Sequence, residues 1–238
     1  VGSEMCIRDR SKVISYYDDV AATFTNFAMS GIDKVHFGLE AAVSIPIYHT
    51  LALNGAVSWG QYTYDSNPYY LQTQDNSGDI VSDGYVYWKD FRVESTPQTA
   101  VNVGLSWRSN NNIYLSADFN YYNNMYLSMS PIYRTDAVIT GGMAPGDIEH
   151  LRRQEKFDSA YTLNASIGKN WYIHRKYTLG FSLDVKNILN NQDIKTGGYE
   201  QTRLSKNTET TVTTYQAFDS KYFYMFGTTY YLNLYFRF

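Results

Sequence analysis

The strongest constraint on the fold is the alternation of side chains along the last stretch of the chain, residues 222–238. One set of alternate residues is apolar or aromatic and consists of Tyr230, Leu232, Leu234, Phe236 and Phe238. The intervening set is mostly polar or amphipathic and consists of Thr229, Tyr231, Asn233, Tyr235 and Arg237. A period of two predicts an extended strand with two unlike faces. Because the apolar face ends on the terminal aromatic residue, we interpret the strand as having lipid on one side and water on the other.

The same alternation recurs in six earlier segments, which we predict to be strands: 35–46, 51–64, 97–107, 113–126, 159–173 and 177–189. Residues 12–28 are also rich in strand formers, but Asp18 and Asp19 break the alternation, so we expect one bulged strand or two short ones. Pro46 is expected to end its strand because proline has no N–H for the ladder. We expect the apolar face of the well-phased strands to be free of charge. The opposite face carries Glu40, Asp118, Asp184 and Lys186.

The connections between these segments alternate in length. Short turns at 47–50, 109–112 and 174–176 alternate with long polar stretches at 65–95, 129–157 and 191–221. Long connections without structure of their own are uncommon in soluble domains, whereas outer-membrane barrels combine short turns on one side with long loops on the other. We therefore predict an all-β fold, an antiparallel transmembrane β-barrel, of which this chain supplies about eight strands. Eight strands can close alone, or form the last part of a larger barrel.

Composition agrees with this interpretation. The net charge is -3, so nothing indicates nucleic acid as a partner. The chain has 24 Tyr, a residue suited to interfaces with one apolar and one wet side, and contains no apolar run of about 20 residues that would predict a membrane helix. The only cysteine is Cys6. Residues 1–10 resemble translated sequencing adaptor, so we exclude them and expect residues 11–238 to be the C-terminal part of a barrel.

Three places in the sequence carry a family resemblance. The segment GIDKVHFGLEAAV (31–43) has Gly38 and Glu40 at the positions of a "GxE" strand signature, and FSLDVKNILNNQDIKTGGYEQTR (181–203) carries an Asn-x-x-Asn tail at Asn187 and Asn190. The third place is the terminal Phe238. In their order and spacing, over residues 12–238, these features resemble the C-terminal barrel of TonB-dependent outer-membrane receptors, in the Tyr- and Asn-rich style of the Bacteroidota.

The resemblance implies a 22-stranded barrel with an N-terminal plug domain in the bacterial cell outer membrane. It implies energised uptake of a scarce ligand, such as a ferric siderophore, a cobalamin or a glycan. The implied partners are outer-membrane lipid and lipopolysaccharide, the plug domain, the TonB complex through the N-terminal part, and the barrel-assembly machinery through the C-terminal strand ending in Phe238. It implies no cofactor.

The candidate ligand-binding residues lie in the long polar stretches. Aromatic side chains there could stack on a sugar or a chelate, and two arginines in HLRRQEK (150–156) could contact an anionic ligand or lipopolysaccharide. These candidates are Tyr69, Tyr70, Tyr85, Tyr87, Trp88, Arg152 and Arg153. We interpret Trp59, Trp107 and Trp171 as interfacial belt residues. Scattered histidines predict no metal site, and the acidic stretch 75–79 lacks the Glu of a calcium loop.

No catalytic constellation is found, so we expect no enzyme. Two other functions remain open from the residues alone. One is a complete eight-stranded outer-membrane protein with a structural or adhesive role, although many small residues on the polar face fill an interior poorly. The other is a soluble secreted β-sandwich that binds glycans and folds in water without detergent.

Overall fold

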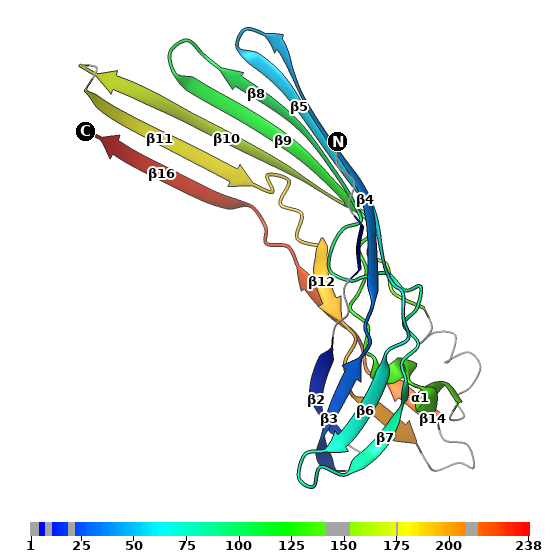
Figure 1. Cartoon of the computed structure of the whole chain (residues 1–238). Helices are drawn as coiled ribbons and strands as arrows, with labels where there is room; N and C mark the ends of the chain where they lie inside the picture. Colours follow the sequence, from blue (N-terminus) through cyan, green and yellow to red (C-terminus); the bar gives the residue numbers. More distant parts are fainter. Residues whose placement is uncertain (1–4, 8–10, 19–21, 141–152, 175, 208–213) are drawn as a thin grey trace.

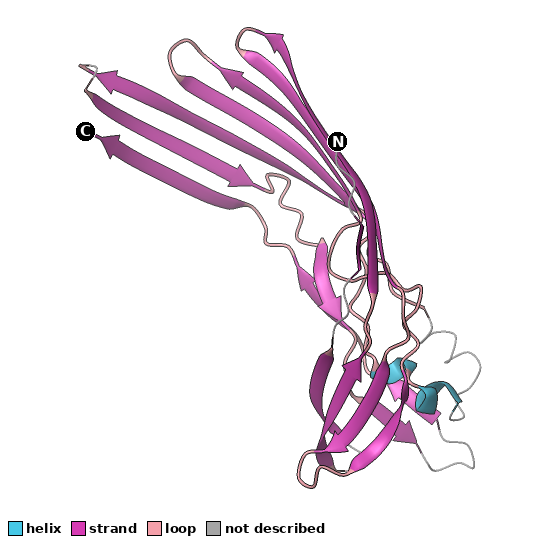
Figure 2. Ribbon diagram, viewed as in Figure 1, coloured by secondary structure: helices cyan, strands magenta, loops and turns pink. Residues whose placement is uncertain are grey.

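The computed structural model describes residues 5–7, 11–18, 22–140, 153–174, 176–207 and 214–238. The chain is all-β and mostly antiparallel, with 63% of the described residues in strands and 4% in helices, as the alternating segments predict. It has two parts, a long curved sheet and a head at one end of that sheet (Figures 1 and 2). The head is built from the long connections between the strands of the sheet, together with residues 11–33.

The long sheet contains eight strands in a single layer. In their order across the sheet they are β1 (Met5–Ile7), β4 (Lys34–Tyr48), β5 (Leu51–Tyr64), β8 (Thr99–Arg108), β9 (Ile113–Asn123), β10 (Ala160–Ile173), β11 (Tyr177–Lys186) and β16 (Thr229–Arg237). All neighbours are antiparallel. Among the described residues the order is linear, with no pairing that closes it into a barrel. The seven segments predicted to be well-phased strands are confirmed.

One prediction about these strands is confirmed in part, and one is wrong. Residues 12–28 form two short strands, one of the two expected alternatives, but these strands pair as a hairpin in the head and do not join the long sheet. Pro46 does not end its strand, since β4 runs on to Tyr48 with a register shift between Pro46 and Tyr48 that accommodates the missing N–H. The excluded first ten residues contribute β1, whose backbone pairs with β4 over three residues.

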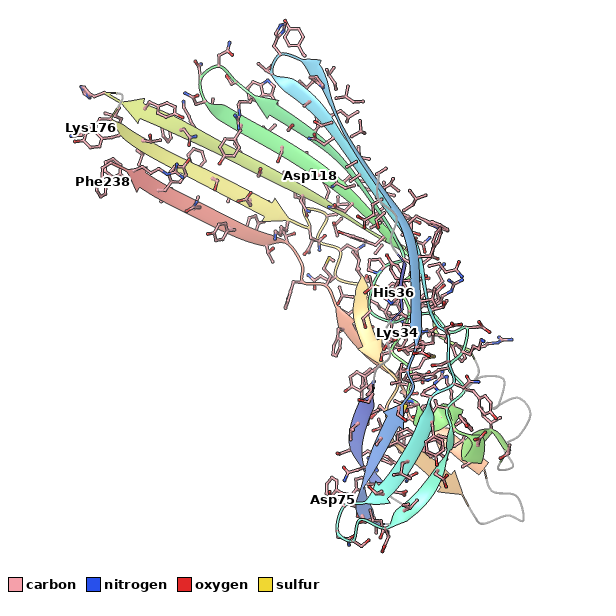
Figure 3. The ribbon with its side chains drawn as sticks, viewed as in Figure 1. Lys34, His36, Asp75, Asp118, Lys176 and Phe238 are labelled. Carbon is pink, nitrogen blue, oxygen red and sulfur yellow. The ribbon has the colours of Figure 1, made fainter. Side chains whose placement is uncertain are left out.

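The register aligns the apolar sets of all seven long strands on one face. Leu39 lies opposite Trp59, Val103 opposite Phe119, and Leu183 opposite Leu232. No element covers this face in the described part of the chain, and its side chains, which Figure 3 draws along the strands, are exposed or half-buried. One expectation fails here, because Lys169 lies on the same face opposite Phe181.

Lys169 lies on β10 towards its turn with β11, and its Nζ is 5.3 Å from the centre of the Trp171 ring. A long cationic side chain near the end of a strand can rest its methylenes on an apolar surface while its charge reaches water. The charge of Lys169 can therefore reach water, whereas a charge at the middle of the apolar face could not.

The head contains a second sheet and two small strand pairs. The four-stranded sheet runs β2 (Lys12–Asp18), β3 (Thr23–Ser30), β6 (Tyr69–Gln74) and β7 (Ile80–Tyr85). Around it lie the pairs β12 (Lys195–Tyr199) with β15 (Lys221–Tyr224) and β13 (Leu204–Asn207) with β14 (Thr214–Ala217), the 3-10 helix η1 (Ile132–Arg134) and the helix α1 (Asp136–Thr140). The long polar stretches thus have secondary structure of their own.

The hydrophobic core lies in the head and not in the long sheet. It includes Phe27, Met29, Ile32, Tyr64, Tyr70, Val86, Trp88, Val93, Met129, Ile132, Tyr133 and Val138. The long strands reach it only at their head-side ends, for example through Tyr64. Phe27 and Tyr70 stack with their ring centres 4.7 Å apart, and Tyr64 packs on Trp88 at the same distance. Side-chain packing therefore stabilises the head, whereas backbone hydrogen bonds between neighbouring strands stabilise the long sheet.

Candidate functional site

On the polar face of the long sheet, polar side chains of neighbouring strands form hydrogen bonds with one another. Ser44 donates to Asn54 at 2.7 Å, Asn102 donates to Asn120 at 2.9 Å, and Ser116 and Ser166 lie 2.8 Å apart. Between these rows, small residues leave a depression of about 440 Å³, lined by Glu40, Ala42, Ala56, Ser58, Ala100, Asn102, Asn120 and Tyr122. Ser58 donates to the Glu40 carboxylate at 3.2 Å. Such a face suits contact with water or with a polar partner.

Glycines on this face are covered by tyrosines. Tyr114 of β9 lies directly opposite Gly168 of β10, and its ring occupies the space that a Cβ at residue 168 would need. Tyr235 of β16 covers Gly180 of β11 in the same way, and its hydroxyl donates to Asn170. Gly38 faces Gly60 across β4 and β5, and Tyr62 lies over Gly60. Gly38 therefore has a structural role, since two strands and an aromatic ring come close together there.

Side chains of the Asn-x-x-Asn tail form hydrogen bonds between the end of β11 and the residues that precede β16. Asn187 is buried, its backbone has a φ of 51°, and its Nδ2 donates to the carbonyl oxygens of Asn191 and Phe226, both at 3.0 Å. Asn190, also with a φ of 51°, accepts from the backbone N–H of Thr228 at 3.1 Å. Asparagine tolerates this left-handed conformation better than most residues. The structural role predicted for Asn187 and Asn190 has this physical basis.

The head contains a pocket of about 480 Å³. Its walls come from connections far apart in sequence and include Tyr133, Arg153, Glu155, Glu200, Phe218, Asp219 and Tyr222. Lys195 donates to Glu155 Oε1 at 3.0 Å, and the Tyr222 hydroxyl donates to Glu155 Oε2 at 2.7 Å. The Lys195 ammonium also lies 3.8 Å from the centre of the Tyr222 ring. One carboxylate of the pocket is thus fixed by two donors.

Glu200, on another wall, is fixed by Arg134. The Arg134 side chain is 1% exposed, and its Nη1 and Nη2 donate to the two carboxylate oxygens of Glu200 at 2.5 and 2.8 Å. Ser130 N also donates to Glu200, at 2.8 Å, and the Phe91 ring lies 5.4 Å from the guanidinium. The sequence analysis missed Arg134, Glu200 and Tyr222. A charged residue in an isolated helical turn among apolar neighbours, as in PIYRTDAV (131–138), was a usable signal of burial.

The predicted ligand-contacting aromatics divide into two groups. Tyr70 and Trp88 are 1% and 2% exposed and belong to the core, so no ligand can stack on them in this structure. Tyr69, Tyr85 and Tyr87 are exposed, and the first two form an edge-to-face pair with ring centres 5.7 Å apart. These tyrosines lie apart from the pocket lining.

The other predicted residues have clear positions. Arg153 lines the pocket, while Arg152 lies outside the described residues. Trp59, Trp107 and Trp171 are exposed on the apolar face, and Phe238 follows β16 with its side chain exposed. Within the described ranges, no group of His, Cys, Asp and Glu side chains is arranged to hold a metal ion.

Tyrosine ionisation in the head is suppressed by its packing. Burial raises the pKa of Tyr133 to about 12 from an ordinary value of 10.0. Burial also raises the pKa of Tyr16 and Tyr70. The pKa of Tyr222 is raised by burial and then by its hydrogen bond to Glu155, because an ionised phenol could no longer donate to that carboxylate. A raised pKa keeps these hydroxyls protonated near neutral pH.

Comparison of the chain with family models, with curated proteins and with solved structures found no match. No helix in the described part of the chain is long and apolar enough to cross a membrane. The functional conclusion therefore depends on the geometry of the chain itself.

Proposed function

We propose that this chain is the C-terminal part of the barrel wall of a TonB-dependent outer-membrane receptor. The observation that carries the proposal is the two-faced long sheet, whose seven long strands align apolar side chains on one face and hydrogen-bonded polar side chains on the other. A bare apolar face of this extent is unusual for a protein in water, because such patches are normally covered. Lipid on one face and a wet interior on the other satisfy both surfaces.

The arrangement of the connections supports the same function. The turns β4–β5, β8–β9 and β10–β11 are short and lie at the end away from the head, while the long connections gather in the head (Figure 1). Strands of an outer-membrane barrel have this asymmetry between their two ends. In the proposed receptor the head is the external side, where a ligand first meets the protein.

The alternative functions make different structural demands. A β-sandwich needs a second sheet against the apolar face, and no such layer is present among the described residues. A complete eight-stranded barrel needs β4 or β1 to pair with β16, whereas the described order leaves β16 at an edge. That edge is free to pair with a further strand of the gene product, as the receptor proposal requires, since hydrocarbon does not tolerate unpaired backbone groups.

The proposal is tested by asking which face of the sheet meets lipid. Adjacent residues of β8 provide a matched pair, because Leu105 belongs to the apolar face and Ser106 to the polar face. In a Cys6→Ser background, Leu105→Cys and Ser106→Cys are each labelled with a bimane fluorophore. The complete gene product is then reconstituted in vesicles whose acyl chains carry bromine, a contact quencher. Phe24→Cys, an exposed position in the head, serves as the control outside the membrane.

We expect bromine to quench the label at Leu105 strongly and to spare the labels at Ser106 and Phe24. Equal quenching at Leu105 and Ser106, or none at either, contradicts a barrel wall. The gene then separates the two membrane functions. In-frame strands and a plug domain encoded upstream of codon 11 support the receptor, whereas a signal peptide directly upstream supports the small barrel.

A further inference from the structure

Charge is distributed unevenly between the two ends of the long sheet. The parts of the long strands nearer the turns, at the end away from the head (Figure 1), are residues 43–55, 105–117, 167–183 and 232–238. These stretches contain no Asp or Glu, although the whole chain has 23 acidic residues against 20 Lys and Arg. Their basic residues are Arg108, Lys169, Arg175, Lys176 and Arg237, of which Arg175 lies outside the described residues. The turn end of the sheet is therefore basic in a chain whose net charge is -3.

Two of these cations lie near aromatic rings of the apolar face, in the hairpin of β10 and β11. Lys169 is opposite Ile113, the first residue of β9, so it lies level with the neighbouring turn. Its Nζ is 5.3 Å from the centre of the Trp171 ring, and the Nζ of Lys176 is 5.3 Å from the centre of the Tyr177 ring. Neither lysine has an ion-pair partner among the residues that the structure describes. Their charges are therefore not neutralised within this part of the chain.

The rings beside these lysines belong to an aromatic patch on the apolar face. Trp171 packs on Phe181 with the ring centres 5.9 Å apart, and Tyr177 stacks on Phe236 at 5.7 Å. Aromatic rings and long basic side chains at one level are typical of the zone in which a membrane-spanning segment passes from hydrocarbon to headgroups. An acidic protein in solution would match the charges but not the apolar face that adjoins them, whereas an anionic lipid matches both.

We propose that the turn end of the β10–β11 hairpin binds the phosphate of an anionic phospholipid. The ammonium groups of Lys169 and Lys176 donate charge-assisted hydrogen bonds to the phosphate oxygens, and the acyl chains lie along the apolar face. A zwitterionic headgroup carries a cation of its own, and the turn-side stretches contain no acidic side chain to receive it. The site therefore selects a lipid of net negative charge. This proposal rests on the proposed function, which places the sheet in a bilayer and the lipid in the leaflet opposite the head.

The experiment compares two lipid headgroups at one position of the sheet. Ile173→Cys, exposed on the apolar face at the end of β10, is labelled with bimane in the Cys6→Ser background of the complete gene product. Vesicles of phosphatidylcholine receive equal fractions of brominated phosphatidylglycerol or brominated phosphatidylcholine with the same acyl chains. The ratio of the two quenching curves gives the relative association constant of the anionic lipid. Lys169→Gln, Lys176→Gln and the double variant remove the charges, and Lys186→Gln, an exposed lysine at the head-side end of β11, is the matched control.

We expect phosphatidylglycerol to be preferred, and each single substitution of Lys169 or Lys176 to lower the preference about fivefold, the effect of one basic residue near an anionic surface. The double variant should show no preference, whereas Lys186→Gln should keep the full preference. Equal quenching by the two lipids, a preference that the double variant retains, or an equal loss in Lys186→Gln would each overturn the proposal. Displacement of the brominated lipid by unlabelled lipid A but not by unlabelled phosphatidylglycerol would assign the site to lipopolysaccharide and overturn it as well.

Failure of this proposal is distinguishable from failure of the receptor proposal. Quenching at both Leu105 and Ile173 without a headgroup preference leaves the barrel wall in the membrane and removes only the phosphate site. Quenching at Ile173 alone, with a preference for the anionic lipid, retains the phosphate site and contradicts the barrel wall. No quenching at either position contradicts both.

Discussion

The guanidinium of Arg134 and the carboxylate of Glu200 meet at two points inside the head, although 66 residues separate them in sequence. The pair joins η1 to the connection after β12, next to the isolated parallel bridge between Ser128 and Tyr199. Since both groups are largely buried, their mutual satisfaction holds these connections in place.

Arg134→Ala is therefore expected to destabilise the head severely, by about 3–5 kcal/mol, because it leaves the Glu200 carboxylate buried without its partner. Peptide-resolved native-state hydrogen exchange of the head measures this as a lower free energy of opening. Lys195→Ala is the control, since Lys195 and Glu155 are each about one third exposed and such a pair contributes about 0–1 kcal/mol. Equal decreases in the free energy of opening for Arg134→Ala and Lys195→Ala would contradict the larger contribution of the buried pair.

Gly168→Ala is expected to cost about 1–3 kcal/mol in the opening of the β9–β10 ladder, because the added Cβ overlaps the Tyr114 ring. Gly55→Ala is the matched control on the other face, where the Cβ would meet Val43 at an ordinary 3.5 Å. Adding Tyr114→Ala to Gly168→Ala should recover part of the loss. Hydrogen exchange of residues 113–123 measures the two Gly168 variants, and that of residues 51–64 measures Gly55→Ala. Equal losses of ladder stability in Gly168→Ala and Gly55→Ala would refute the overlap.

Asn187→Gly separates the hydrogen bonds of this residue from its backbone conformation. Glycine accepts a φ of 51° without strain, so the remaining effect is the loss of the side-chain hydrogen bonds: those that Nδ2 donates to Asn191 and Phe226, and the one that Oδ1 accepts from the N–H of Asn191. Leaving these acceptors unsatisfied is expected to cost about 1–3 kcal/mol. The readout is faster exchange at the head-side end of β11 and β16, around Lys186 and Thr229. Unchanged exchange around Lys186 and Thr229 would show that the Asn187 side chain does not stabilise the head-side ends of β11 and β16.

Alkaline pH should destabilise the head through its buried tyrosines. The folded-state pKa of Tyr133, about 12, lies above the ordinary value of 10.0, so the unfolded chain loses its proton first as the pH rises. Stability is then constant below about pH 10 and falls as the pH rises from 10 towards 12. A tyrosinate absorbance titration should show a group of tyrosines ionising late, and Tyr133→Phe should remove one of them. Early ionisation of all tyrosines would contradict this assignment.

The long sheet was predictable because its signal is local. Period-two alternation marks each strand, and β5 begins and ends at its predicted residues, Leu51 and Tyr64. The strand end predicted at Pro46 was wrong because a register irregularity at the sheet edge accommodates the N–H that proline lacks. Sequence alone does not reveal such an irregularity. Lys169 was missed because its place on the apolar face follows only from continuing the alternation towards the turn.

The head was much less predictable. Its pocket is assembled from walls near residues 133, 153, 200 and 218, and no local pattern connects these segments. The prediction chose aromatic residues of a long polar stretch because their rings could stack on a ligand, and so included the core residues Tyr70 and Trp88. Burial of an aromatic side chain in a head of this kind depends on which connections pack together, and this is decided by long-range contacts such as that between Phe27 and Tyr70.

The separation of the core from the long sheet has an evolutionary consequence. Among the residues that the structure describes, no packed layer of protein covers the apolar face of the sheet, so we expect selection there to act on polarity more than on shape and Leu, Val, Ile and Phe to be interchangeable. The interlocked side chains of the head, such as Trp88 against Tyr64, tolerate far less. The sheet is therefore expected to drift quickly in sequence while keeping its alternation, and the head to change slowly except where its pocket adapts to a new ligand.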